Sequence, residues 1–118
     1  MTTTHDPQLL KGVLSLLLLQ LLAEQESYGY EVVQRVHKIG LTDIVEGTVY
    51  PALARLEREG RLTARLVSSN AGPARKYYRP TKAGYHALEL GKANWLTLAD
   101  VVVAVLDRPI PAAPIEGN

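Results

Sequence analysis

The chain has 118 residues, 47% of them hydrophobic, and its 13 Lys and Arg against 12 Asp and Glu give a formal net charge of +1. This length allows one domain with a packed core and leaves surface for a partner subunit. The absence of cysteine excludes disulfides and thiolate metal or redox chemistry, and a reducing cytoplasmic location is expected.

The charges are unevenly distributed along the chain. Residues 55–82 hold eight basic and two acidic side chains, a net charge of +6, whereas the other residues carry −5. A basic segment of this kind is typical of a surface that meets nucleic acid phosphates. The eight basic residues are Arg55, Arg58, Arg61, Arg65, Arg75, Lys76, Arg79 and Lys82.

The first helix is predicted over the aliphatic run from Leu9 to Ala23, after a flexible N-terminus of residues 1–8. Lys11 and Ser15 point away from Gln20, so this helix has no single polar stripe and needs cover on most sides. We expect a second subunit to supply part of that cover.

A secretory signal is the alternative interpretation of this run, but no small-x-small cleavage site follows it. The run is also shorter than the roughly 18 apolar residues that a membrane span requires. We therefore expect no membrane partner.

A second helix is predicted from about Tyr28 to Lys38, with Ser27 as its cap and Gly40 as its end. Four apolar residues lie on one face of this helix and are expected to be buried. They are Val32, Val33, Val36 and Ile39.

The stretch from Val45 to Gly60 predicts a third helix with two different faces. One face repeats apolar residues at three- and four-residue spacing and can be buried. The other offers hydroxyl and guanidinium donors, which suit a helix lying in a DNA groove. A solvated amphipathic helix is the alternative. The apolar face holds Val49, Ala52, Leu53 and Leu56, and the polar face holds Thr48, Tyr50, Arg55 and Arg58.

The order helix, helix, short turn, helix is that of a helix-turn-helix motif. Residues 61–67 then alternate between polar and apolar, residues 68–73 form a turn cluster, and residues 75–79 return as a second strand. A basic hairpin after this motif is a wing. A plain hairpin that caps the core is the alternative, but it has no need of Arg75, Lys76 and Arg79 together.

A long helix is predicted from about Lys82 to Leu106, with more apolar width than the surface helix of a monomer should show. Residues 82–107 are therefore assigned to homodimerisation, and residues 108–118, with three prolines, to a disordered tail. The predicted fold is mainly α with a small β-hairpin: a winged helix-turn-helix over residues 9–81 and one C-terminal helix.

The sequence gives no sign of catalysis or of a cofactor. No nucleophile and base stand at a motif spacing, and no glycine loop is suited to cradle phosphate. His5, His37 and His86 share no ligand spacing, so no metal site is expected. We expect the protein not to be an enzyme.

Four segments together resemble the PadR family of winged-helix transcriptional regulators, over about residues 9–106. They are Leu10-Lys11-Gly12-Val13-Leu14, Tyr28-Gly29-Tyr30-Glu31, the run from Glu46 to Glu57, and the run from Gly72 to Gly84. The single C-terminal helix is similar to that of the short subfamily. The resemblance implies a homodimer held by the first and C-terminal helices, which binds a two-fold-related operator in double-stranded DNA. It also implies repression, released in some members by a small aromatic effector.

The candidate DNA contacts lie on the third helix and the wing. Thr48 and Tyr50 are predicted to meet phosphate, and Arg55 to meet phosphate or a guanine edge. Tyr50 could equally be a core aromatic with a bonded hydroxyl. Arg75 and Lys76 are predicted to contact the DNA backbone or the minor groove. Tyr28 and Lys38 complete the predicted DNA-binding set, whereas Tyr77 and Tyr78 are assigned to packing.

The candidate effector site consists of Trp95, Leu14 and Leu98. The resemblance implies that Trp95 stacks on flat ligands at the centre of the dimer, and simple filling of the dimer seam is the alternative. A second hypothesis for the whole chain is a winged-helix module that docks on protein without recognising an operator.

Overall fold

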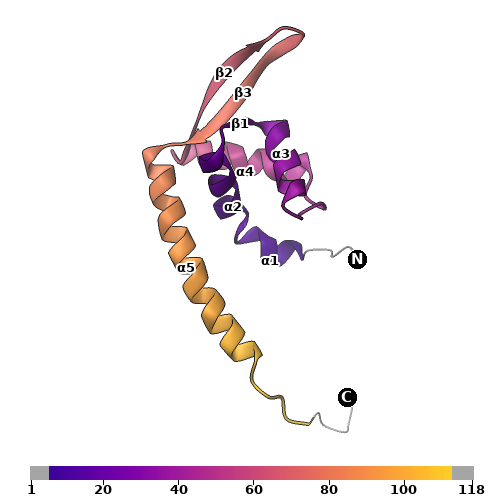
Figure 1. Cartoon of the computed structure of the whole chain (residues 1–118), viewed down its shortest axis with the longest axis vertical. Helices are drawn as coiled ribbons and strands as arrows, with labels where there is room; N and C mark the ends of the chain where they lie inside the picture. Colours follow the sequence, from indigo (N-terminus) through magenta and orange to yellow (C-terminus); the bar gives the residue numbers. More distant parts are fainter. Residues whose placement is uncertain (1–5, 113–118) are drawn as a thin grey trace.

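The computed structural model describes residues 6–112. In chain order the elements are α1 (Pro7–Lys11), α2 (Leu14–Glu24), β1 (Ser27–Tyr28), α3 (Gly29–Lys38), α4 (Glu46–Arg58), β2 (Leu62–Ser69), β3 (Gly72–Pro80) and α5 (Lys82–Leu106). The shorter helices gather below the β2–β3 hairpin, and α5 runs past them and away from the body (Figure 1). The predicted fold class, mainly helical with a small antiparallel sheet, is confirmed.

The core is built around α2, which packs against α3, α4, α5 and β3. Because four elements of the same chain surround this helix, one subunit already buries most of it. Leu16 and Leu17 are only half-buried in one subunit, and the cover that a second subunit would add to this helix stays a prediction. The buried residues of α2 are Leu14, Leu18, Leu19, Leu21 and Leu22.

The predicted first helix is interrupted in the structure. It divides at Gly12 and Val13 into α1 and α2. Helix α1 begins at Pro7, within the segment predicted to be flexible, because the Asp6 carboxylate accepts a hydrogen bond of 2.9 Å from the Gln8 N–H. Residues 1–5 of that segment, and residues 113–118 of the predicted tail, lie outside the described part of the chain.

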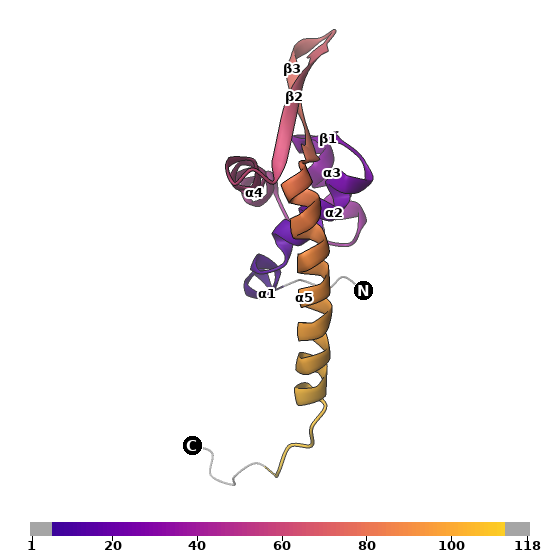
Figure 2. The ribbon, with the colours of Figure 1, turned by 90° about the vertical axis from the view of Figure 1, so that its left-hand side faces the viewer.

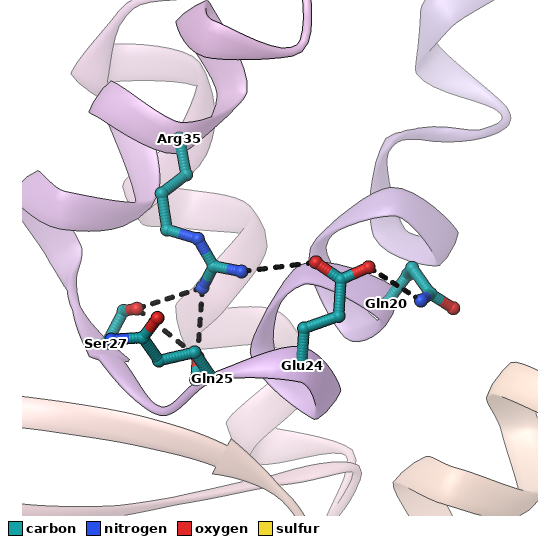
Figure 3. A network of polar contacts seen from close by, with 5 residues as sticks. All are labelled: Gln20, Glu24, Gln25, Ser27 and Arg35. Carbon is teal, nitrogen blue, oxygen red and sulfur yellow. Dashed lines mark hydrogen bonds and ion pairs between the residues drawn. The ribbon is translucent and has the colours of Figure 1, made fainter.

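Ser27 does not cap α3, contrary to the prediction. It lies in β1 and is 1% exposed. Its hydroxyl donates to the Gln25 carbonyl over 3.2 Å and accepts from the Arg35 guanidinium over 3.0 Å. Arg35 also donates to the Gln25 carbonyl and pairs with Glu24 at 3.4 Å (Figure 3). This network ties the end of α2 to α3 across the loop between them.

Helix α3 starts after Tyr28, whose N–H donates to the Glu31 carboxylate over 3.1 Å. Val32, Val33 and Val36 are buried as predicted. Ile39 is 52% exposed, contrary to prediction, because it follows the last helical residue and no longer shares the helix's buried face.

Helix α4 has the two faces that its spacing predicts. Val49, Leu53 and Leu56 are at most 1% exposed. The helix has no side-chain cap at Val45, and it ends before Gly60, which adopts the left-handed conformation with φ of +79°. The buried face fixes how α4 is rotated against the core and therefore which residues it presents outward.

The sheet is antiparallel with the order β1-β3-β2. The hairpin strands are longer than predicted, and only residues 70–71 separate them rather than a turn over residues 68–73. The short strand β1 was not predicted, because two residues are too few to show alternation. Its pairing with β3 anchors the base of the wing to the helical body.

Helix α5 has the bounds that the sequence predicts and is capped by Thr81, whose hydroxyl oxygen accepts from the Gly84 N–H over 3.0 Å. Its first part packs against α2, and its second part projects away from the other helices (Figure 2). Leu88 is buried, whereas the apolar side chains from Trp95 to Leu106 are largely exposed. Within residues 6–112 no helix is long and apolar enough to cross a membrane.

Candidate nucleic-acid interface

The polar face of α4 is open to solvent, as predicted. Thr48, Tyr50, Arg55 and Arg58 are all exposed, while the opposite face of the helix is buried. Hydroxyl and guanidinium groups on one exposed helix face can donate hydrogen bonds to the phosphate oxygens and base edges of DNA.

Tyr50 is a surface residue and not a core aromatic, because 42% of it is exposed. One edge of its ring lies against Gly29 at the start of α3, where an added Cβ would come within 2.9 Å of the ring. Burial of the ring, followed by the nearby charge of Glu46, raises the pKa of the Tyr50 hydroxyl. A tyrosine hydroxyl is protonated near neutral pH even at its ordinary pKa, so this group is able to donate a hydrogen bond to phosphate.

At the base of the wing, cationic and aromatic side chains stack on each other. The Arg75 guanidinium lies 4.6 Å from the centre of the Tyr28 ring. The Tyr28 and Tyr77 rings meet edge to face with centroids 5.3 Å apart. Tyr28 thus orients Arg75, while Tyr77 packs as expected.

The strand β2 is fixed by a bidentate ion pair between Arg65 and Glu26, with distances of 2.7 and 2.8 Å. The hydrogen bond from Arg65 holds the pKa of the Glu26 carboxyl below its usual range. Planar pairing of this type restricts both side chains, so the wing is held against the loop that follows α2.

Lys76 links the wing to α4. Its ammonium group lies 2.8 Å from the Glu57 carboxylate and 5.5 Å from the centre of the Tyr78 ring. The hydrogen bond to Glu57 raises the pKa of Lys76. The predicted contact of Lys76 with DNA would therefore compete with its ion pair to Glu57.

Arg55 points to the opposite side of α4 from Glu57, because two residues correspond to about 200° of rotation. Its guanidinium donates to the Ser15 hydroxyl over 2.8 Å and lies 3.9 Å from Glu59. The structure thus places this predicted contact to phosphate or a guanine edge at the border between α4 and α2.

Four of the predicted DNA-binding residues surround one cleft of about 270 Å³ between α3, α4 and β3. Thr48 and Arg55 border a different groove, and exposed Lys38 lies at the far end of α3 and borders neither. The four residues of the cleft are Tyr28, Tyr50, Arg75 and Lys76, and the prediction missed its other aromatic residue at the α3 start, Tyr30.

Trp95 and Leu98 line a groove of about 340 Å³ between α2 and α5, together with Leu16 and Arg61. Leu14 is not part of it, since it is buried and faces the groove on the other side of α2. One subunit therefore brings together two of the three predicted effector residues.

Comparison with known proteins identifies the family. The model of the transcriptional regulator PadR-like family matches residues 18–90. A PadR-like transcriptional regulator from Bacillus cereus is 37% identical, with 86% of this chain and 99% of that chain covered and a TM-score of 0.77. A PadR family transcriptional regulator from Eggerthella lenta is 33% identical, with 86% and 88% covered and a TM-score of 0.80. The chain belongs to the PadR-like family of transcriptional regulators.

Membership in this family gives the function of the chain as a whole. The PadR-like chain is a DNA-binding regulator of transcription and not an enzyme. Among curated sequences, a Lysinibacillus sphaericus protein is 29% identical over 96 residues, which cover 80% of this chain and 88% of that protein.

Proposed function

We propose that this PadR-like protein is a cytoplasmic homodimeric repressor that binds a two-fold-related operator and is released by a small aromatic effector. The observation that supports it most strongly is the cleft in which Tyr28, Tyr50, Arg75 and Lys76 converge from three elements beside the exposed face of α4. No Asp or Glu lines that cleft among the described residues. A cationic and hydroxyl-rich surface of this kind suits a phosphate backbone.

The dimer is supported by the second half of α5, whose apolar side chains are left exposed by the part of the chain that the structure describes. A two-fold axis along these helices would present two copies of α4 to one face of DNA. Helix-turn-helix dimers bind half-sites about 34 Å apart, one turn of the duplex.

Arg75→Ala is expected to weaken binding to every duplex to a similar extent and to lower the salt slope of binding by about one. Arg55→Ala should in addition relax sequence preference if Arg55 reads a base. Fluorescence anisotropy across a salt series, with duplexes selected from a random pool, measures both effects. Lys92→Ala on α5 is the control, because Lys92 pairs with Glu89 away from the wing.

A salt slope that stays unchanged in Arg75→Ala would rule out Arg75 as a phosphate contact. Binding to a protein partner with no affinity for any duplex would favour the alternative, a winged-helix interaction module. The +6 charge of residues 55–82 favours DNA over that alternative.

Glu57→Gln is expected to strengthen DNA binding by up to about fivefold, since it releases Lys76 from an ion pair between partly exposed groups worth at most ~1 kcal/mol. The same anisotropy titration at low salt measures the change. Glu89→Gln, which removes an equal charge from α5, should leave the affinity unchanged. Equal or weaker binding by Glu57→Gln would show that the Lys76–Glu57 pair orders the wing and does not compete with DNA.

The effector is proposed to bind beside Trp95, because the groove there combines an exposed indole with Leu16 and Leu98. Trp95 is the chain's only tryptophan, so its emission reports directly on that groove. Titration with a panel of planar aromatic compounds should quench or shift this emission and weaken DNA binding in parallel. Unchanged emission across the panel would leave Trp95 with a packing role only.

A further inference from the structure

A groove of about 590 Å³ lies between α1, α2 and α4, and it is larger than the clefts at the wing and at Trp95. Its volume falls within the range of roughly 300–1,000 Å³ that is typical of small-molecule sites. The floor is apolar and combines Leu10 of α1, Leu14 of α2, Ile44 of the turn and Ala52 of α4. These elements meet here because the break at residues 12–13 turns α1 out of line with α2.

The rim of this groove is cationic. Lys11, Arg55 and Arg58 border it, and Asp43 is the one carboxylate among the described residues that line it. Within residues 6–112, Lys11 and Arg58 form no ion pair. Positive side chains without partners, set around an apolar floor, are complementary to a molecule with one negative group and a hydrocarbon body.

Helix α1 forms one wall of the groove but is only loosely attached to the protein. None of its residues is buried, and Leu9 is 79% exposed. A wall that buries so little apolar surface can shift at small energetic cost to admit a ligand.

We propose that this groove binds an amphipathic carboxylate of the medium-chain fatty acid class. The carboxylate pairs with Lys11 and Arg58 at the rim, and the hydrocarbon chain lies on Leu10, Leu14 and Ile44. Arg55, which donates to the Ser15 hydroxyl, is a third cation that lines the groove.

A ligand in this groove would regulate DNA binding directly. This regulatory role rests on the proposed function. Thr48, Arg55 and Arg58 line the groove and also belong to the exposed face of α4. A bound carboxylate would occupy the cations that otherwise meet phosphate, so that ligand and DNA exclude each other. The groove beside Trp95 is lined by no residue of α4.

The test is isothermal titration of the full chain with octanoate in the absence of DNA. We expect saturable binding by the wild type and an affinity at least about tenfold lower in the double variant Lys11→Gln/Arg58→Gln, because each cation makes a charge-assisted hydrogen bond. Lys92→Gln and Trp95→Leu should bind octanoate as the wild type does. The neutral analogue 1-octanol should bind at least about tenfold more weakly than octanoate.

Two results would overturn the proposal: no saturable heat with octanoate, or binding that is lost in Trp95→Leu and kept in the double variant. A second titration adds octanoate to wild-type protein bound to a selected duplex, and release of the duplex is expected. Octanoate binding by a protein with no affinity for DNA would refute the proposed function alone. DNA binding without octanoate binding would refute this site alone.

Discussion

Gly84→Ala is expected to lower the free energy of unfolding by about 3 kcal/mol, the upper part of the range for overpacking a tight site. A Cβ at position 84 would overlap the carbonyl oxygen of Arg61 and lie 3.2 Å from the Pro80 side chain. The Arg61 carbonyl cannot easily withdraw, since it accepts a hydrogen bond of 3.0 Å from the Thr81 N–H. The Thr81 hydroxyl in turn donates to the Gly60 carbonyl over 2.6 Å. These hydrogen bonds hold the start of α5 against the segment that follows α4.

Urea unfolding followed by circular dichroism, at one fixed protein concentration, measures this loss as a lower midpoint at unchanged slope. Gly72→Ala is the matched control, because nothing lies within 4 Å of a Cβ at that position in the hairpin. If the free energies of unfolding of the two variants agree within about 0.5 kcal/mol, the backbone of α5 and Arg61 can move apart to fit the added methyl group at little cost.

Helices α3, α4 and α5 were predictable from local sequence because their signals are local. The spacing of Val49, Leu53 and Leu56 defines the buried face of α4, and Thr81 and Lys82 mark the start of α5. A left-handed glycine after α4 could likewise be expected at Gly60, since only glycine adopts that conformation without strain.

The wrong assignment of Ser27 arose because a distant segment decides the structure there. Ser27 has the residue type of a helix cap, but its backbone pairs with Tyr78 of β3, about fifty residues later. Nothing in the sequence around Ser27 reports that partner. The packing of β3 and α5 on α2 is likewise not visible in the sequence around α2, because both elements return from the other end of the chain.

The chemistry of the site was predictable by residue type, whereas the partners of each side chain were not. A cluster of Arg, Lys and Tyr in residues 48–79 indicates a phosphate-binding surface. The pairing of Lys76 with Glu57 and of Arg55 with Ser15 joins residues 19 and 40 positions apart. Those contacts decide which cations are free, and they depend on how β3 and α2 pack against α4.

Val102→Glu is expected to dissociate the proposed dimer and leave the subunit folded. Val102 is 43% exposed within its own chain, and Leu98 and Val105 on the same face are 58% and 45% exposed. A charge at this position therefore disturbs little within one subunit. In a dimer built on this face it would bring two carboxylates into an apolar seam. Burial of unpaired charges costs several kcal/mol per ion, so the dissociation constant should rise by at least about a thousandfold.

Sedimentation velocity should show a mass of two chains for the wild type and of one chain for Val102→Glu at the same micromolar concentration, with unchanged far-ultraviolet circular dichroism. Ala104→Glu is the control, because position 104 lies about 200° around α5 from position 102 and is also exposed. It should remain dimeric. DNA affinity should fall only in Val102→Glu, since a lone subunit contacts one half-site and loses the second set of contacts. A Val102→Glu protein that stays dimeric would place the interface elsewhere and would remove α5 from the proposed arrangement of the two reading helices.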